Sequence, residues 1–120
     1  MFAELLDRYH EKGLDILVFP CNEFGNQEPG TNEDIRQFIL DHSKPVPFMM
    51  SKMIHSIQGN DLFTWLRTNM PPDDPLGNGP ITWNFNKFLV NRDGKVVRRY
   101  SSDAQLERLD EDILVELSPL

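Results

Sequence analysis

The chain has 120 residues, enough for one domain, and it is 39% hydrophobic and 26% charged, which is ordinary for a globular protein. Its formal net charge of −7 argues against nucleic acid or anionic lipid as the main partner. Its single cysteine, Cys21, excludes an internal disulfide framework. The longest apolar stretches are far too short to cross a bilayer, so we expect no membrane span.

The first elements predict half of a βαβ unit. Residues 2–12 repeat apolar side chains on one helical face, and Gly13 stands where a helix C-cap belongs. Residues 14–19 then form an apolar run that predicts a buried strand, which Pro20 stops.

The middle of the chain predicts two more helices and a short strand. Thr31 or Asn32 can cap a helix whose apolar side holds Ile35, Phe38 and Ile39. Prolines end that helix before a short strand at 47–50. A further helix is expected at 61–69, and a loop rich in proline follows it at 70–80.

The last third contains the clearest hairpin in the chain. Two strands, 86–91 and 95–100, flank Asp93-Gly94, which favours a turn with positive φ. Phe88, Val90, Val96 and Tyr100 are expected to alternate on these strands, and a final helix is expected near 110–117. The order α-β-α-β-α-β-β-α predicts an α/β fold with a mixed central sheet flanked by helices.

Two loops contain side chains suited to chemistry. Residues 19–30 follow a predicted strand, and Gln27 there offers an amide donor and an acceptor. Trp83 and Asn84 precede another strand and offer an indole N–H and an amide. Taken singly, each has a simpler interpretation: a turn held by polar side chains, and a core tryptophan beside a turn residue. Trp65, within a helix, is interpreted as core.

Cys21 has two interpretations. A thiol at the end of a strand can be reactive where nearby groups lower its pKa. Glu23 and Glu28 would oppose a thiolate, however, so a buried and inert cysteine is favoured. The three histidines lie on separate predicted elements without ligand spacing, so we expect no metal site.

Together the two loops resemble a known family. The stretch Phe-Pro-Cys-Asn-Glu-Phe-Gly-Asn-Gln-Glu-Pro-Gly at 19–30 resembles the signature of glutathione peroxidases, and Trp-Asn-Phe-Asn-Lys-Phe-Leu-Val at 83–90 resembles their second signature. The resemblance implies a thioredoxin-like fold and reduction of hydroperoxides by a cysteine or selenocysteine. It also implies catalytic roles for Gln27, Trp83 and Asn84, whose N–H groups would stabilise the anionic nucleophile.

The same resemblance implies that the nucleophile lies outside the chain. In the family it sits between the first core strand and the first helix, and Cys21 matches a different cysteine. We therefore expect one domain over residues 1–120, incomplete at its N-terminus and without its first strand and nucleophile loop. One hypothesis is an upstream selenocysteine codon read as a stop, which makes Met1 the next available start.

The resemblance also suggests a reductant. Thioredoxin-dependent members have a resolving cysteine in the segment that resembles residues 48–62, and this chain has none there. Glutathione is therefore expected as the reducing co-substrate, with no bound cofactor. The short loop at 70–82 resembles that of monomeric members, so a monomer is favoured over a tetramer. Arg98 and Arg99 form a basic pair that could attract glutathione carboxylates, but a solvated strand end is favoured.

The sequence leaves two alternatives open. The chain could be a non-catalytic thioredoxin-like binding or scaffold protein derived from a peroxidase. It could instead be a thiol enzyme that uses Cys21 itself. The cytoplasm is the favoured compartment.

Overall fold

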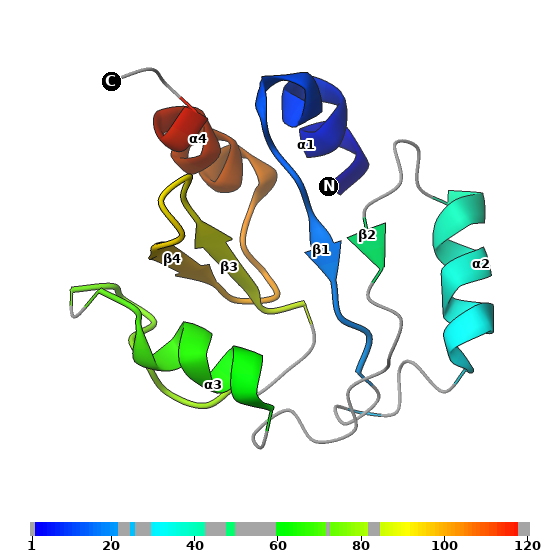
Figure 1. Cartoon of the computed structure of the whole chain (residues 1–120), viewed down its shortest axis with the longest axis horizontal. Helices are drawn as coiled ribbons and strands as arrows, with labels where there is room; N and C mark the ends of the chain where they lie inside the picture. Colours follow the sequence, from blue (N-terminus) through cyan, green and yellow to red (C-terminus); the bar gives the residue numbers. More distant parts are fainter. Residues whose placement is uncertain are drawn as a thin grey trace. The chain divides into compact units, whose positions relative to one another are not determined.

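The structure is a computed structural model, shown as a ribbon in Figure 1. It describes residues 2–21, 25, 30–42, 48–49, 60–71, 73–81 and 85–117. The chain divides into two compact units, 1–55 with 117–120, and 56–116, and each is described by itself below. Helices and strands occur in both units, as the α/β prediction requires.

The first unit begins with the helix α1 (Phe2–Tyr9), which continues as a short 3₁₀ turn, η1 (His10–Lys12). Leu5, Leu6 and Tyr9 are its buried side chains, and they share one face because they recur every three to four residues. Gly13 ends the turn in the left-handed region at φ 116°, so the predicted glycine cap is confirmed.

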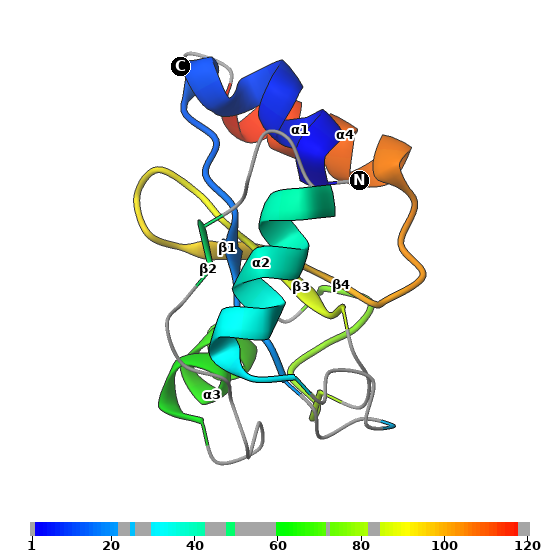
Figure 2. The same ribbon diagram turned by 90° about the vertical axis from the view of Figure 1, so that its right-hand side faces the viewer.

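The strand after α1 is shorter and more exposed than its apolar run predicts. β1 (Leu17–Val18) pairs in parallel with β2 (Phe48–Met49), with Leu17 opposite Phe48 (Figure 2). Leu17 is 52% exposed, so the prediction of a buried strand over 14–19 is wrong at this position. A continuous apolar run is buried only where other elements cover both faces of the strand, and Leu17 remains open to solvent.

The helix α2 (Asn32–His42) begins with the predicted cap. The N–H of Asp34 donates to Oγ1 of Thr31 at 3.1 Å, and the N–H of Thr31 donates to Oδ2 of Asp34 at 3.2 Å. This reciprocal pair satisfies two of the free N–H groups at the start of the helix. Ile35 is buried, but Phe38 is 61% exposed and stacks on the ring of His42, so the buried side is narrower than predicted.

The second unit begins with α3 (Asp61–Thr68), which Asn60 caps by accepting from the N–H of Phe63. Leu66 and Met70 are buried with Val96, and Phe63 and Phe88 pack against them. Trp65 is 47% exposed, so its interpretation as core is wrong. It directly precedes the buried Leu66 in α3, so its side chain points away from the buried face of the helix.

The hairpin forms where it is predicted. β3 (Lys87–Val90) pairs antiparallel with β4 (Val96–Tyr100). Oδ1 of Asn91 accepts from the N–H groups of Asp93 and Lys95, both at 3.0 Å, and Gly94 adopts φ 81°. The turn thus uses the positive φ that Asp-Gly favours.

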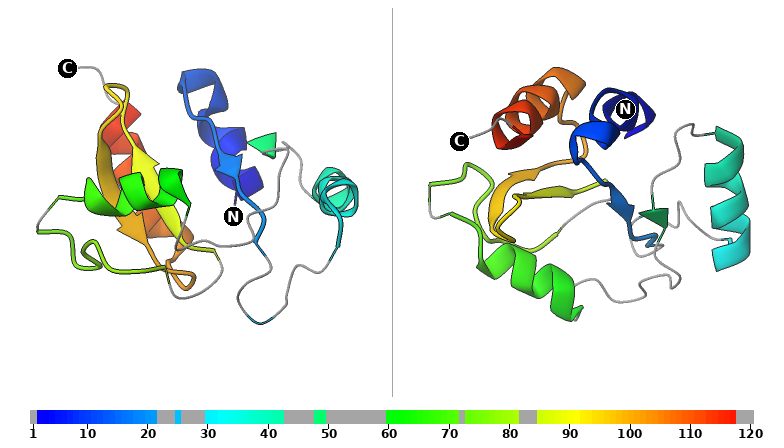
Figure 3. Two further views of the ribbon diagram at one scale, coloured as in Figure 1. Left: turned by 60° about the horizontal axis from the view of Figure 1, so that its bottom comes forward. Right: turned by 45° about the horizontal axis from the view of Figure 1, so that its top comes forward.

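A bulge in this hairpin changes which side chains share a face. Leu89 pairs with Arg98 but Val90 pairs with Val96, so Val97 is the extra residue. Val96 packs with α3, whereas Tyr100 bonds to Asp112 of α4 (Leu106–Leu117). Simple alternation would place Val96 and Tyr100 together, and the bulge separates them. Figure 3 shows α3 and α4 on opposite faces of the hairpin.

Candidate functional site

The predicted catalytic residues Gln27, Trp83 and Asn84 lie outside the residues that the structure describes. Their convergence on one cavity therefore stays a prediction. The chain is described on both sides of Trp83-Asn84, where Ile81 is 3% exposed and Phe85 begins the approach to β3. These flanks provide the geometry that bears on the site.

Cys21 follows β1 as a free, half-buried cysteine in an isolated β-bridge. Glu23 and Glu28, which are expected to oppose a thiolate there, lie outside the described residues. Both interpretations of this thiol therefore stay open.

Phe85, directly after the predicted Trp-Asn pair, has an unusual backbone. Its φ is 57°, the one positive value for a residue other than glycine among the described residues, and its side chain is 68% exposed. A bulky side chain in this region strains the backbone, because Cβ crowds the carbonyl group. Such strain persists only where neighbouring interactions hold it, and it tends to occur at functional sites.

Lys87 supplies such an interaction. Its Nζ donates to the carbonyl oxygen of Phe85 at 2.7 Å and to that of Ser101 at 3.4 Å, and it lies 5.9 Å from the centre of the Phe85 ring. Partial burial lowers the pKa of Lys87 from its usual 10.5, and the charge of Asp103 partly opposes this. The Asp103 carboxylate is fixed in turn by the hydroxyl of Ser101.

Arg99 lies on the other face of the hairpin and is buried, with only 5% of its surface exposed. Its guanidinium donates to the carbonyl oxygens of Gly77, Gly79 and Pro80, at 3.0 Å for Pro80, and lies 5.4 Å from the centre of the Phe88 ring. The interpretation of Arg98-Arg99 as a solvated basic strand end is therefore wrong for Arg99. It anchors the loop that precedes Ile81.

An acidic residue accompanies this buried arginine. Asp74 is 7% exposed, and its Oδ1 accepts from the N–H of Leu76 at 3.0 Å. Burial and the charge of Arg67 lower the pKa of Arg99, while the charge of Asp74 raises it. Within the described part of the chain, Oδ2 of Asp74 and Nε of Arg99 are buried without hydrogen-bond partners. Opposite charges close together offset part of the cost of burying both.

Arg98 points to the α4 face instead, and its contact there is weak. Its Nε lies 4.0 Å from Oδ2 of Asp112, and both side chains are partly in water. The same oxygen accepts from the hydroxyl of Tyr100 at 2.6 Å. Burial, and then this hydrogen bond to Asp112, raise the pKa of Tyr100 far above its usual value. The phenol therefore joins β4 to α4 and stays protonated over the physiological range.

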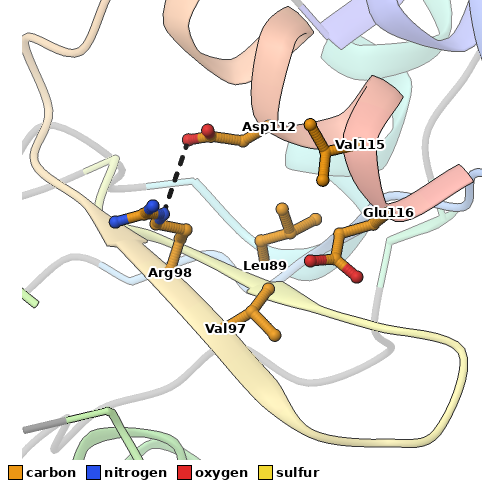
Figure 4. Close-up of a pocket in the computed structure, with 6 residues that line it drawn as sticks. All are labelled: Leu89, Val97, Arg98, Asp112, Val115 and Glu116. Atoms are coloured by element: carbon orange, nitrogen blue, oxygen red, sulfur yellow. Dashed lines mark ion pairs between the residues drawn. The ribbon is translucent and has the colours of Figure 1, made fainter. Parts of the chain in front are cut away.

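A shallow cavity of about 200 Å³ lies between the hairpin and α4, lined by Leu89, Val97, Arg98, Asp112, Val115 and Glu116 (Figure 4). Arg98 and Asp112 form its ion pair, drawn dashed in Figure 4. None of the predicted catalytic residues lines it. Among the described residues, no cluster of His, Cys, Asp or Glu could hold a metal ion, and no helix could span a membrane.

Sequence reasoning missed Lys87 and Arg99, which bind the described chain at Phe85 and at 77–80, and Asp74, which accompanies the buried arginine. The bulge explains the omission of Arg99, because strict alternation places it on the face opposite the 77–80 loop. Lys87 could have been found, since it stands within the second signature stretch and only three residues after Asn84.

Comparisons with known proteins agree with the two motifs. The family model for glutathione peroxidase matches residues 1–67. The phospholipid hydroperoxide glutathione peroxidase of Callithrix jacchus is 36% identical over 93% of this chain and 58% of its own length. The probable phospholipid hydroperoxide glutathione peroxidase of Mesembryanthemum crystallinum is 40% identical over 92% of this chain and 64% of its own length. Glutathione peroxidase-like peroxiredoxin 2 of Saccharomyces cerevisiae is 40% identical over 96% of this chain and 70% of its own length.

A solved structure supports the same relationship. The crystal structure of Trgpx in its apo form matches with a TM-score of 0.63 and 28% identity, covering 97% of this chain and 65% of that one. The chain thus spans less than two thirds of the length of this structure and of the first two relatives. On the family model, the relatives and the shared thioredoxin-like α/β fold, the chain belongs to the glutathione peroxidase family.

Proposed function

We propose that this chain is part of an antioxidant peroxidase that reduces hydrogen peroxide and organic hydroperoxides with glutathione. The observation that carries the proposal is the presence of two long signature stretches, 19–30 and 83–90, in the family's order within a chain 36–40% identical to its relatives. The nucleophile would be a cysteine or selenocysteine outside these 120 residues.

The proposed chemistry has two steps. The thiolate or selenolate attacks the outer peroxide oxygen, the O–O bond breaks, and the alkoxide takes a proton and leaves as an alcohol or water. The nucleophile becomes a sulfenic or selenenic acid. Two glutathione thiols then reduce it, and they leave as glutathione disulfide with one water. No metal or bound cofactor is needed.

The roles of this chain's residues follow from where negative charge lies during the first step. The amides of Gln27 and Asn84 and the indole N–H of Trp83 would donate hydrogen bonds to the anionic nucleophile, which lowers its pKa and keeps it reactive near neutral pH. Fixed donors stabilise that charge without reorganising during the reaction.

The test compares the 120-residue chain with a product extended upstream in frame. Activity with glutathione and hydrogen peroxide is expected in the extended product alone, and Gln27→Ala or Trp83→Phe is expected to lower its rate constant with peroxide by about 10²-fold. Lys95→Met, an exposed change in the hairpin turn, is the control. An extended product that has the nucleophile and the full fold but no activity would contradict the proposal.

A binding or scaffold role is the second candidate, because Cys21 is the only cysteine in the chain. It predicts no activity in either form. A third outcome, activity of the short chain that disappears in Cys21→Ser, would assign the chemistry to Cys21. Residues 1–120 are proposed to be part of one domain, and gel filtration of the extended product tests the associated proposal that the protein is a monomer and not a tetramer.

A further inference from the structure

We infer that Lys87 and Arg99 are positioning residues that fix the two ends of the short segment carrying Trp83 and Asn84. The inference rests on the proposed function for its catalytic consequence, but its structural content can be tested separately. Neither residue is part of the donor set that surrounds the nucleophile in the proposal above.

The first anchor lies before the segment. Arg99 donates to the carbonyl oxygens of Gly77, Gly79 and Pro80 from a buried position on β4. Ile81, the next residue, is 3% exposed. The planar guanidinium suits this role, because its N–H groups diverge in fixed directions and can bind several carbonyl groups at once.

The second anchor lies after the segment. Lys87 Nζ binds the carbonyl oxygen of Phe85 and that of Ser101, which follows β4. It thereby ties the residue with φ 57° to the end of the neighbouring strand. The strained backbone of Phe85 needs such a restraint, since an extended conformation would otherwise be preferred.

The two anchors belong to the same hairpin, so the pairing of its strands fixes their positions relative to each other. Lys87 is in β3 and Arg99 is in β4, and the strands pair Lys87 with Tyr100 and Phe88 with Arg99. Only Thr82, Trp83 and Asn84 separate Ile81 from Phe85 in the sequence. The hairpin therefore binds the chain at Pro80 and at Phe85, on either side of that stretch.

The bulge at Val97 makes this arrangement possible. It turns Arg99 to the α3 side, where the 77–80 loop is bound, while Arg98 faces α4 and Asp112. Without the extra residue, Arg98 would face α3 and the 77–80 loop, and Arg99 would face α4. The bulge thus selects which of the two arginines becomes the anchor.

The structural test labels tryptophan with a fluorine atom in the active form of the protein and records the ¹⁹F NMR spectrum. The Trp65→Phe and Trp83→Phe variants assign the resonances of these two tryptophans. Lys87→Met is expected to shift or broaden the Trp83 resonance and to leave that of Trp65, on α3, unchanged. Lys95→Met, the matched control at the hairpin turn, is expected to change neither.

Activity provides the second measurement. Lys87→Met is expected to lower the rate constant with hydroperoxide at least tenfold and that with glutathione less than twofold, and Lys87→Arg is expected to restore most of the loss. Arg99→Lys, at the other end of the segment, is likewise expected to lower the rate constant with hydroperoxide more than the rate constant with glutathione. Arg98→Lys is its control. Lys87→Gln replaces Lys87→Met if the latter fails to fold.

The outcomes separate the inference from the proposed function. A Trp83 resonance that stays unchanged in a folded Lys87 variant overturns the inference, whatever the activity. If the parent protein reduces no peroxide, the proposed function fails and the resonance alone decides the inference. Loss of both tryptophan resonances in every Lys87 variant would mean a general structural role and would also overturn it.

Discussion

The two small sheets of this chain differ in how their strands are held together. β3 and β4 adjoin in sequence, a turn closed by Asn91 joins them, and side chains on both faces are buried or bonded to neighbours. β1 and β2 pair over two residues each and are separated in the sequence by the whole of α2, and Leu17 is half exposed. The hairpin is thus stabilised by side chains within its own unit, whereas β1 exposes an apolar side chain, Leu17, to solvent.

Arg99→Met tests the support of the hairpin most severely. It leaves three carbonyl groups without their donor and Asp74 without its compensating charge, so the free energy of unfolding is expected to fall by about 3–5 kcal/mol. Urea denaturation followed by circular dichroism measures this. Arg98→Met, on the exposed face of the same strand, is expected to cost less than about 1 kcal/mol. Equal losses for both variants would show that Arg99 is not an anchor.

Tyr100→Phe tests the contact between the hairpin and α4. Removing the donor to Asp112 is expected to cost about 1.5–3 kcal/mol at neutral pH. Folding raises the pKa of Tyr100 above its usual 10.0, so above that pH the unfolded phenol loses its proton while the native one keeps it. The native state then binds more protons, and the free energy of unfolding falls as the pH rises.

This alkaline loss is measured as the difference between the parent protein and Tyr100→Phe from pH 8 to pH 11. The lowered pKa of Lys87 acts in the opposite direction, because its native state binds fewer protons as the pH approaches 10.5. Both proteins contain Lys87, so its contribution cancels in the difference. Parallel pH profiles for the two proteins would refute the role assigned to Tyr100.

A matched pair of truncations compares the sheets directly. Val96→Ala, at a position 5% exposed, is expected to cost about 2 kcal/mol, and Leu17→Ala, at 52% exposed, less than about 1 kcal/mol. Denaturation of both variants in the 120-residue chain and in the extended product completes the test. A Leu17→Ala cost that rises to that of Val96→Ala in the extended product would show that added chain covers β1. A large cost in the short chain would contradict the comparison.

Local sequence predicted the elements that depend on neighbouring residues. Gly13, Thr31 and Asp93-Gly94 marked helix and hairpin boundaries that the structure confirms, since caps and turns are bonded within a few positions. The predicted start of α4, Asp110, is four positions too late: the helix begins at Leu106, and Leu106 and Leu109 already stand at helical spacing before Ile113.

Burial was harder to predict because it depends on what covers each face. Leu17, Phe38 and Trp65 are all in apolar patterns and all exposed, since periodicity gives the direction of a face but not its cover. Arg99 shows the opposite case, a charged residue buried by a bulge that no spacing rule reveals. The catalytic roles of Gln27, Trp83 and Asn84 stay predictions. The contacts of Lys87 and Arg99 come from the structure alone.

The smallest expected effect concerns the turn that joins β3 to β4. Gly94 has φ 81° and nothing within 4 Å of an added Cβ, so Gly94→Ala tests the backbone alone and is expected to cost about 1–2 kcal/mol. Gly79 is equally open but does not have a positive φ, so Gly79→Ala is expected to be neutral or slightly stabilising. Thermal denaturation of the two variants separates strain from crowding. If Gly94→Ala proves neutral as well, the turn tolerates another conformation, and the stability of the hairpin comes from its packing against α3 and α4.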